Sequence, residues 1–312
     1  MFAATLFCQV LLATAVYAVP TSKERFAQRA ARRATGFAHQ SQPKTLSPGT
    51  AQSNLITNNS HVDYSPNWGG AVLVADTVTI PVRNSVRHEF HTHCISCGFQ
   101  ATYTSVTGTF VVPTPSQPSG GSDSYSASAW VGIDGDTCQT AILQTGLDFT
   151  VSGSSVTYDG TRLQPVCIVS KAHARFMIAW YEWYPDFAYD FTDISFSAGD
   201  TVTVSVTATS LTGGTATITN ESTGQTVSHT FSDQPSLCEY NAEWIVEDFE
   251  SGGSLVSFAN FGTVTFTGAS ATTNSGTTVG PSGSTLIDIE QDSTVLTSVS
   301  TNSDSVTISY VG

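Results

Sequence analysis

The feature that most restricts the fold of this 312-residue chain is a repeated alternation of apolar and polar side chains. It is clearest in TVTVSVTATS (201–210), TATITNESTGQTVSHTF (215–231) and SVTISYVG (305–312). A period of two places one set of side chains on each face of a β-strand, and Gly, Asn and Asp turns separate the runs. No stretch longer than a few residues has helical periodicity. The sequence therefore predicts an all-β sandwich.

One segment could be mistaken for an amphipathic helix. CEYNAEWIVEDFE (238–250) combines acidic and apolar residues, but its Trp, Ile, Val and Phe suit a strand at least as well. Residues 63–312 fall within the size of a single sandwich domain, with a core large enough to need no disulfide staple.

The distribution of charge indicates an acidic working environment. All 11 Lys and Arg residues lie before position 45 or within two blocks, 78–100 and 160–178, while 25 Asp and Glu residues give a formal net charge of −14. Such a fold repels itself at neutral pH, and the repulsion fades as carboxylates protonate. Nucleic-acid binding is disfavoured, because the body has no cations to neutralise phosphates.

The N-terminal region predicts secretion. Residues 1–18 contain the apolar run LFCQVLLATAV and end in Val-Tyr-Ala, as in a signal peptide; the alternative is a buried first helix. Residues 19–62 are basic and then polar, which predicts a propeptide whose cations pair with the acidic body near neutral pH and release it in acid. A merely disordered leader remains the alternative. No later segment is apolar enough to cross a membrane, so we expect a secreted, extracellular protein and, by default, a monomer.

Several longer motifs point to one family. They are NWGG (67–70), SVTGTFVVP (105–113), AWVGIDGDTC (129–138), TAILQTG (140–146), WYEWYPDFAYDF (180–191), FSAGD (196–200) and CEYNAEWIVEDFE (238–250). Together, and in this order, they resemble the fungal glutamic peptidases, or eqolisins. The resemblance implies a sandwich of two antiparallel sheets, of the concanavalin-like or jelly-roll type, with acid endopeptidase activity on polypeptides and neither metal nor cofactor.

The resemblance also implies a catalytic dyad, Gln144 in TAILQTG and Glu243 in NAEW. In acid, a Ser or Cys nucleophile is poorly activated, because its His partner is protonated and cannot act as a base. A carboxylate can still be ionised, so Glu243 would deprotonate a water that attacks the scissile carbonyl. Gln144 does not titrate, so its amide would donate to the developing oxyanion while its carbonyl orients the water.

Five further residues match the family near the dyad. Two aromatic residues would wall the cleft and three acidic residues, protonated in acid, would donate hydrogen bonds around the dyad: Trp68, Trp130, Asp134, Asp159 and Glu182. For each of them a purely structural role is the competing interpretation.

Two blocks depart from the family pattern. VTIPVRNSVRHEFHTHCISCGFQ (78–100) separates NWGG from SVTGTF, and GTRLQPVCIVSKAHARFMI (160–178) separates Asp159 from Ala179. Deleting both blocks restores the family pattern. Together the two blocks hold all Lys and Arg residues that follow position 44. We hypothesise that they are retained introns, with genuine loop insertions as the alternative, and expect both to be excursions from the sandwich rather than core strands.

The cysteines follow the same division. Cys8 belongs to the predicted signal peptide, and three of the remaining five lie in the two blocks, which leaves Cys138 and Cys238 to pair in an oxidising compartment. The first block also has the composition of a zinc site, but an acid protein would protonate the His ligands and lose the metal. Its candidate ligands are His88, His91, His93, Cys94 and Cys97.

Two other functional classes stay open. A sandwich with exposed aromatic residues also suits a carbohydrate-binding module or a glycoside hydrolase, in which Glu182 and Glu243 would flank the sugar. A catalytically dead homologue, its sandwich wedged apart by real insertions, is the third possibility.

Overall fold

The computed structural model describes residues 39–47, 62–81, 94–118, 124–152 and 174–312. All of them belong to one folded unit, Ala38–Gly312. These residues form β-strands and no helix, which confirms the all-β prediction. Among them, accordingly, no helix is long and apolar enough to cross a membrane.

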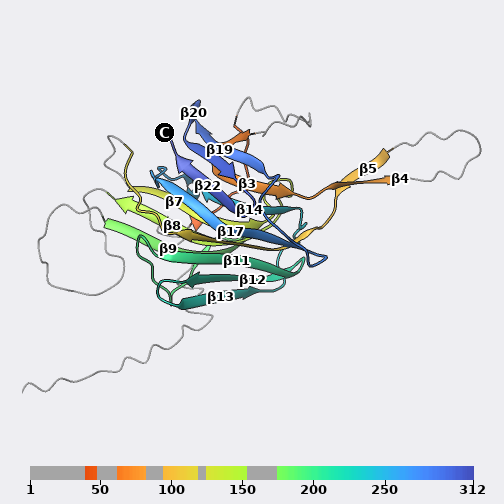
Figure 1. Ribbon diagram of the computed structural model, residues 1–312, viewed down its shortest axis with the longest axis horizontal. Helices are drawn as coiled ribbons and strands as arrows, with labels where there is room; N and C mark the ends of the chain where they lie inside the picture. The colour runs from red at the N-terminus through yellow and green to blue at the C-terminus, as the bar shows by residue number, and fades with distance from the viewer. Residues whose placement is uncertain (1–38, 48–61, 82–93, 119–123, 153–173) are drawn as a thin grey trace, which may run out of the picture. The chain divides into compact units, whose positions relative to one another are not determined.

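The larger sheet has nine strands. Eight of them follow the order β10-β9-β8-β7-β14-β3-β19-β2, and β20 pairs with β19. Their bounds are β2 (Val62–Ser65), β3 (Trp68–Val74), β7 (Ser124–Ile133), β8 (Ile142–Ser152), β9 (Ala174–Tyr184), β10 (Tyr189–Asp190), β14 (Asn241–Glu247), β19 (Thr285–Gln291) and β20 (Thr294–Val295). Neighbouring strands are antiparallel except β2 and β19, which are parallel. Figure 1 shows how β14, from late in the chain, lies between the early strands β3 and β7.

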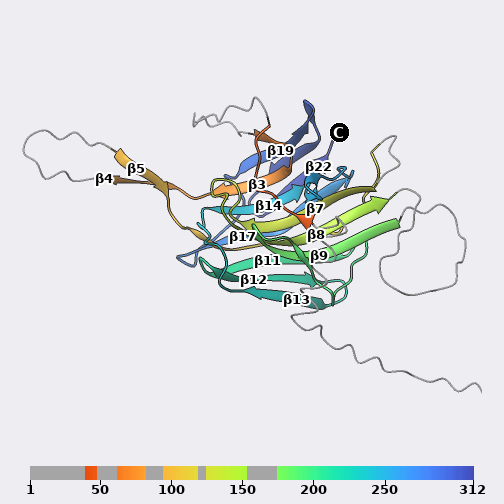
Figure 2. The same cartoon turned by 180° about the vertical axis from the view of Figure 1, so that it is seen from behind.

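The second large sheet, which we call the smaller sheet, has eight strands. Seven follow the order β13-β12-β11-β6-β17-β22-β21, and β18 pairs with β17. Their bounds are β6 (Tyr103–Val111), β11 (Thr201–Ser210), β12 (Gly213–Asn220), β13 (Gln225–Phe231), β17 (Thr263–Thr273), β18 (Thr278–Val279), β21 (Thr297–Thr301) and β22 (Ser305–Tyr310). This sheet packs on the larger one through β6 and β11, which contact β7, β8 and β14. The view from behind in Figure 2 shows the same two layers. The predicted sandwich is therefore confirmed.

Two short sheets complete the fold. One contains β1 (His39–Gln40), β15 (Glu250–Ser251) and β16 (Ser254–Leu255), and the other pairs β4 (Thr77–Pro81) with β5 (Cys94–Phe99). The first of these attaches residues of the predicted propeptide to the chain that follows β14.

The larger sheet is buried on both faces. Its inner face packs against the smaller sheet in the main core, which includes Val131, Leu147 and Trp244. Its opposite face, which we call the outer face, carries a second buried cluster made of Trp68, Val72, Trp130, Ile142, Trp180, Ile245 and Ile287. Because side chains alternate along a strand, each of these strands contributes to both clusters.

The strand predictions can be compared with these bounds. TVTVSVTATS is β11, and the 238–250 segment contains β14 rather than a helix. The expectation that 160–178 lies outside the sandwich is wrong for its last part, because residues 174–178 begin β9 and pair with β8. Backbone pairing requires only an extended chain beside β8, so the unusual composition did not prevent it. In the first block, β4 and β5 pair only with each other. Apart from Gln100, the remaining residues of both blocks lie outside the described residues.

Candidate active site

Four residues form a row across the outer face of the larger sheet. In the strand register, Glu243 of β14 lies beside Gly132 of β7, Gly132 beside Gln144 of β8, and Gln144 beside Glu182 of β9. Directly opposed residues project to the same face. The sheet therefore brings together Gln144 and Glu243, about 100 residues apart in sequence, across two strand spacings, which is roughly 10 Å between their backbones.

Gly132 keeps the space between these two side chains open. A Cβ at this position would lie 2.8 Å from Trp130 Cζ3 and 3.2 Å from Glu243 Oε2. Any larger residue would push against the Glu243 carboxyl group. The glycine inside a strand thus marks a close approach of functional groups.

The polar groups in the row are fully buried and incompletely paired. Gln144 Nε2 donates to Glu182 Oε2 at 3.0 Å. Both oxygens of Glu243, Gln144 Oε1 and Glu182 Oε1 have no hydrogen-bond partner among the described residues. Buried polar groups without partners are rare in folded proteins, so their concentration here identifies a site built to bind something polar.

Burial sets the protonation of the two glutamates. It raises the pKa of Glu243 well above its usual value, with the charges of Asp134 and Asp136 adding to the rise, and with Lys44 and the nearby backbone N–H of Asp136 opposing it. Burial likewise raises the pKa of Glu182 well above its usual value, and the nearby Glu247 adds to the rise. In this state of the chain burial therefore favours the neutral form of both groups.

The two predicted tryptophans lie next to the row. Trp68 and Trp130 are fully buried and pack edge to face, with ring centroids 5.0 Å apart. Trp130 Nε1 donates to Glu247 Oε2 at 2.9 Å, and burial raises the pKa of Glu247 to about 7. The tryptophans therefore form a wall of the outer face and bring in an acid, Glu247, that was not among the predicted site residues.

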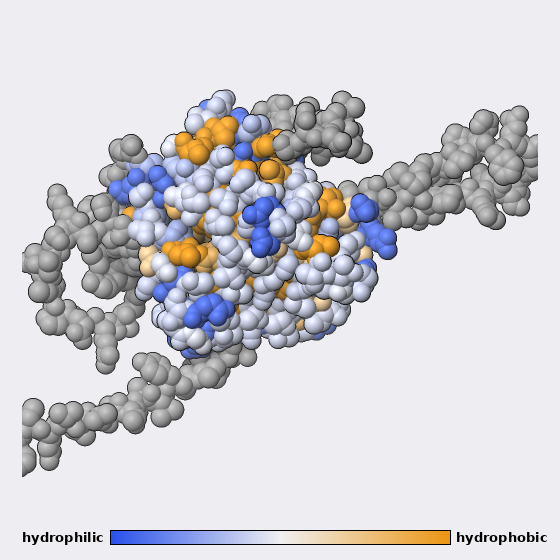
Figure 3. Space-filling model, viewed as in Figure 1, coloured by the Kyte–Doolittle hydropathy of each residue, from blue (hydrophilic) through white to orange (hydrophobic). Residues whose placement is uncertain are grey.

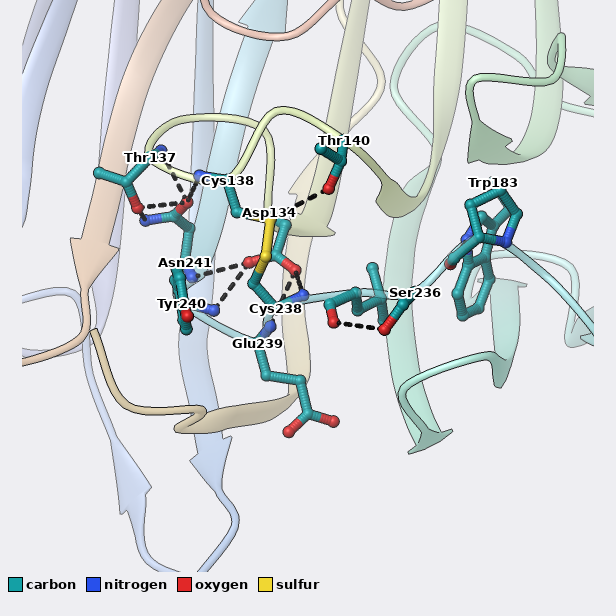
Figure 4. Close-up of a disulfide and its surroundings, with 12 residues drawn as sticks. Asp134, Thr137, Cys138, Thr140, Trp183, Ser236, Cys238, Glu239, Tyr240 and Asn241 are labelled. Carbon is teal, nitrogen blue, oxygen red and sulfur yellow. Dashed lines mark hydrogen bonds between the residues drawn. A yellow bond between two sulfur atoms is a disulfide. The ribbon is translucent and has the colours of Figure 1, made fainter. Parts of the chain in front are cut away.

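Asp134 serves a different purpose from the hydrogen-bond donation expected of it. Its two carboxylate oxygens accept four backbone N–H groups, those of Cys238, Glu239, Tyr240 and Asn241, at 2.7–3.3 Å. Figure 4 shows these bonds beside the disulfide between Cys138 and Cys238. This disulfide confirms the predicted cysteine pairing. Both features fix the chain that leads into Glu243.

Residues 39–47, which we call the crossing segment, run over the outer face. At one end His39 is buried, stacks on Phe249 with ring centroids 4.1 Å apart, and contacts Asp148 Oδ2 through Nδ1 at 2.7 Å. Although burial alone would lower the pKa of His39, Asp148 raises it above its usual value. The segment then passes Glu182, which accepts the Ser41 N–H.

The other end of the crossing segment is held by Lys44. Its backbone N–H donates to Gly135 O at 3.0 Å, and its side chain forms ion pairs with Asp63 and Asp136. Between the two ends, Trp68 Nε1 donates to Gln42 O at 2.9 Å. The segment therefore spans the sheet from β9 to the turn after β7, across the row that contains Gln144 and Glu243.

Some predicted residues cannot be placed. Asp159 lies outside the described residues, as do His88, His91 and His93, and the side chains of Cys94 and Cys97 are not described either. Among the described residues, one cluster has the composition of a metal site, Asp134 with Cys138 and Cys238. Its sulfurs form the disulfide and its carboxylate accepts backbone amides, so it does not suit a metal.

The geometry also separates the peptidase and glycosidase interpretations. Glu182 and Glu243 lie on strands separated by β7 and β8, so their backbones are roughly 14 Å apart. In a glycosidase the two carboxyl groups flank the scissile bond, with the sugar between them. Here Gln144 occupies the intervening space, which favours a Gln–Glu site.

Sequence reasoning missed Gly132, Glu247 and Asp148. A signal was present, because each is an even number of residues from a predicted site residue in what proves to be the same strand. Glu247 follows Glu243 by four, Asp148 follows Gln144 by four, and Gly132 follows Trp130 by two. A period of two places them on the same face.

Comparisons with known proteins point to one family. The sequence model of the Peptidase A4 family matches residues 95–162 and 168–310. Aspergillopepsin-2 of Aspergillus niger is 46% identical over 326 residues, covering 98% of this chain and 99% of the relative. The crystal structure of scytalido-glutamic peptidase with a transition state analog inhibitor superposes with a TM-score of 0.59 at 37% identity, covering 79% of this chain and 98% of that one. Aspergilloglutamic peptidase from Aspergillus niger gives a TM-score of 0.51 at 57% identity, covering 60% and 99%.

Proposed function

Since this chain belongs to the peptidase A4 family of glutamic peptidases, we propose that it is a secreted acid endopeptidase in which Glu243 activates water and Gln144 stabilises the oxyanion. The chain is a glutamic-type endopeptidase and hydrolyses peptide bonds. The proposal concerns its catalytic residues, its control and its location.

The observation that carries the proposal is the row on the outer face. A Gln and a Glu project from alternate strands on either side of a glycine, with three oxygens that have no protein partner among the described residues. A water held between Glu243 and Gln144 Oε1 would donate to one oxygen of each, and a peptide carbonyl could approach it over Gly132.

The chemistry follows from these groups. Ionised Glu243 removes a proton from the water as its oxygen attacks the carbonyl carbon, and the tetrahedral intermediate carries the negative charge on its oxygen. Gln144 Nε2 has two N–H groups; one is bonded to Glu182 and the other is available for this oxyanion. Collapse of the intermediate breaks the C–N bond, and Glu243 returns its proton to the leaving amine.

The crossing segment would hold this machinery inactive. It belongs to the predicted propeptide, residues 19–62, and covers the outer face where a substrate must bind. It also keeps Glu243 buried, and burial is the main cause of its raised pKa. Departure of the segment admits water, lowers that pKa and frees Glu243 to ionise. The protein's own propeptide is thus its first partner.

Location and assembly complete the proposal. Residues 1–18 act as a signal peptide, so the enzyme is extracellular. The visible surface in Figure 3 is mostly weakly polar, with apolar residues in small separate groups. The exposed large apolar residues, including Val111, Leu211 and Val295, come from different strands and turns. Dispersed apolar residues of this kind need no partner, which supports a monomer.

The test is proteolysis in acid after activation of the full-length chain. Pepstatin-type inhibitors, which target paired aspartates, and chelators should leave the activity unchanged. Gln144→Ala should lower it by at least ~10²-fold, the usual effect of removing an oxyanion donor, while the melting temperature stays near that of the wild type. Full activity in Gln144→Ala would refute the assigned role, and inhibition by pepstatin would refute the reaction class.

A further inference from the structure

Two successive backbone N–H groups of the crossing segment donate hydrogen bonds to two buried glutamates. Ser41 N donates to Glu182 Oε2 at 3.3 Å, and Gln42 N donates to Glu247 Oε1 at 3.0 Å. If the segment lies where a substrate binds, these two amides stand in for the main-chain amides of the substrate.

Both acceptors are held in place by the protein itself. Glu182 receives the Gln144 amide on β8, and Glu247 receives the indole N–H of Trp130 on β7. Both glutamates are fully buried. Their positions are therefore set by the sheet before any peptide arrives, which is the arrangement expected of a preorganised binding site.

We propose that Glu182 and Glu247 are substrate-positioning residues that accept two successive backbone N–H groups of the polypeptide and so fix its register over Gln144 and Glu243. The inference rests on the proposed peptidase function and names two groups of that same site that have no part in the proton transfers. Their role is to accept hydrogen bonds and does not require a negative charge.

The protonation of both groups agrees with such a role. Burial raises the pKa of Glu247 to about 7 and that of Glu182 well above its usual value. In acid both are neutral, and a neutral carboxyl group keeps acceptor capacity on its oxygens. Glutamine has nearly the same shape and keeps one acceptor oxygen, whereas methionine has the shape without an acceptor.

The sequence of the crossing segment fits the same pattern. Proline has no backbone N–H, so it is excluded at the two positions that contact the glutamates. The segment has its proline immediately afterwards, at Pro43, whose carbonyl accepts from Asn67 Nδ2 at 3.2 Å. A substrate with proline at either clamped position should therefore bind weakly.

The test compares Glu247→Gln with Glu247→Met in enzyme activated in acid from the full-length chain. Loss of one hydrogen bond made to ground and transition states alike raises KM without changing kcat. We expect Glu247→Met to raise KM by ~10-fold with kcat within ~3-fold of wild type, and Glu247→Gln to restore KM to within ~3-fold. Glu221→Met, at an exposed acid in the turn between β12 and β13, should change neither parameter.

A binding measurement then identifies the hydrogen bond itself. A synthetic peptide of residues 39–47 is methylated on the backbone nitrogen of Gln42 and compared with the unmethylated peptide. Methylation should weaken binding to the wild type by ~10-fold and to Glu247→Met hardly at all, since the acceptor is already absent. Equal weakening in both enzymes, or a Glu247→Gln enzyme as impaired as Glu247→Met, would overturn the inference.

The two proposals can fail separately. Peptide binding requires no catalysis, so the methylation comparison decides the positioning role even if the wild type cleaves nothing in acid. Absence of cleavage by a folded, activated wild type would overturn the proposed function instead. A fall in melting temperature in Glu247→Met alone, without a change in KM, would indicate that Glu247 only supports Trp130, and would also overturn the inference.

Discussion

The two faces of β14 differ sharply although they belong to the same seven residues. Ala242, Trp244 and Val246 face the smaller sheet and are fully buried among apolar side chains. Glu243 and Glu247 face outward on either side of Ile245 and are equally buried, but beside further acids and under the crossing segment. One strand therefore contributes at once to the apolar core and to the catalytic row.

The difference shows how this fold separates stability from function. Apolar burial on the inner face favours folding in proportion to the area removed from water. Burial of carboxyl groups on the outer face without full hydrogen bonding opposes folding, and the inner face must offset that cost. Substitutions on the inner face should therefore lower mainly the stability, and substitutions on the outer face should lower mainly the activity.

The largest expected effect is on the inner face. Trp244→Ala removes a fully buried indole and its hydrogen bond to Thr107 O at 2.8 Å. The free energy of unfolding should fall by about 3–5 kcal/mol, as for other large core truncations. Denaturant unfolding in acid measures it. A loss below about 1 kcal/mol would show that the inner face is not the source of stability.

The next effect belongs to the outer face. Gly132→Ala places a methyl group against Trp130 and the Glu243 carboxyl group, so the dyad should be displaced. We expect kcat/KM to fall by at least ~10²-fold, because a misplacement of about 1 Å suffices for such a loss. The melting temperature should fall less than in Trp244→Ala, because overpacking by one methyl group costs about 1–3 kcal/mol. An active Gly132→Ala enzyme would show that the gap between Gln144 and Glu243 is not needed.

A smaller effect concerns pH. Burial raises the pKa of Asp248 to about 8, that of Glu247 to about 7 and that of Asp288 to about 6. A carboxyl group with a raised folded pKa contributes its full stability below its unfolded pKa, about 4, and loses it as pH rises through the folded value. The melting temperature should therefore fall between pH 4 and pH 8.

Asp248→Asn isolates one of these groups. It keeps an acceptor for Gln291 Nε2, which lies 2.7 Å from Asp248 Oδ2, and cannot ionise. Its melting temperature should match the wild type at pH 4 and exceed it by several degrees at pH 8, with Glu221→Gln as the exposed control. A wild type more stable at pH 7 than at pH 4 would contradict this explanation.

Much of the sandwich was accessible from the sequence. The alternation in 201–210 predicted β11, and the strand interpretation of 238–250 places Glu243 and Glu247 on one face. The order of strands was not accessible, because pairing between β14 and β7 or β3 joins segments more than 100 residues apart. The local alternation of apolar and polar residues carries no information on which distant strands pair.

Two errors have physical causes. Residues 174–178 were expected outside the sandwich because of their composition, but pairing of β9 with β8 uses only the backbone. The expected protonation of the carboxylates was attributed to repulsion between acids alone. In the structure, burial is the larger cause for Glu243 and Glu247, and burial depends on the packed fold.

The most direct test of the whole account is the pair of values kcat/KM and melting temperature for Glu243→Gln. The substitution keeps the shape of a fully buried side chain and removes the proposed base. We expect acid proteolysis to fall by at least ~10²-fold, with a melting temperature equal to that of the wild type in acid and no lower at neutral pH. A Glu243→Gln enzyme that retained near-normal proteolysis would contradict the assignment of Glu243, and with it the division of β14 into a structural and a catalytic face.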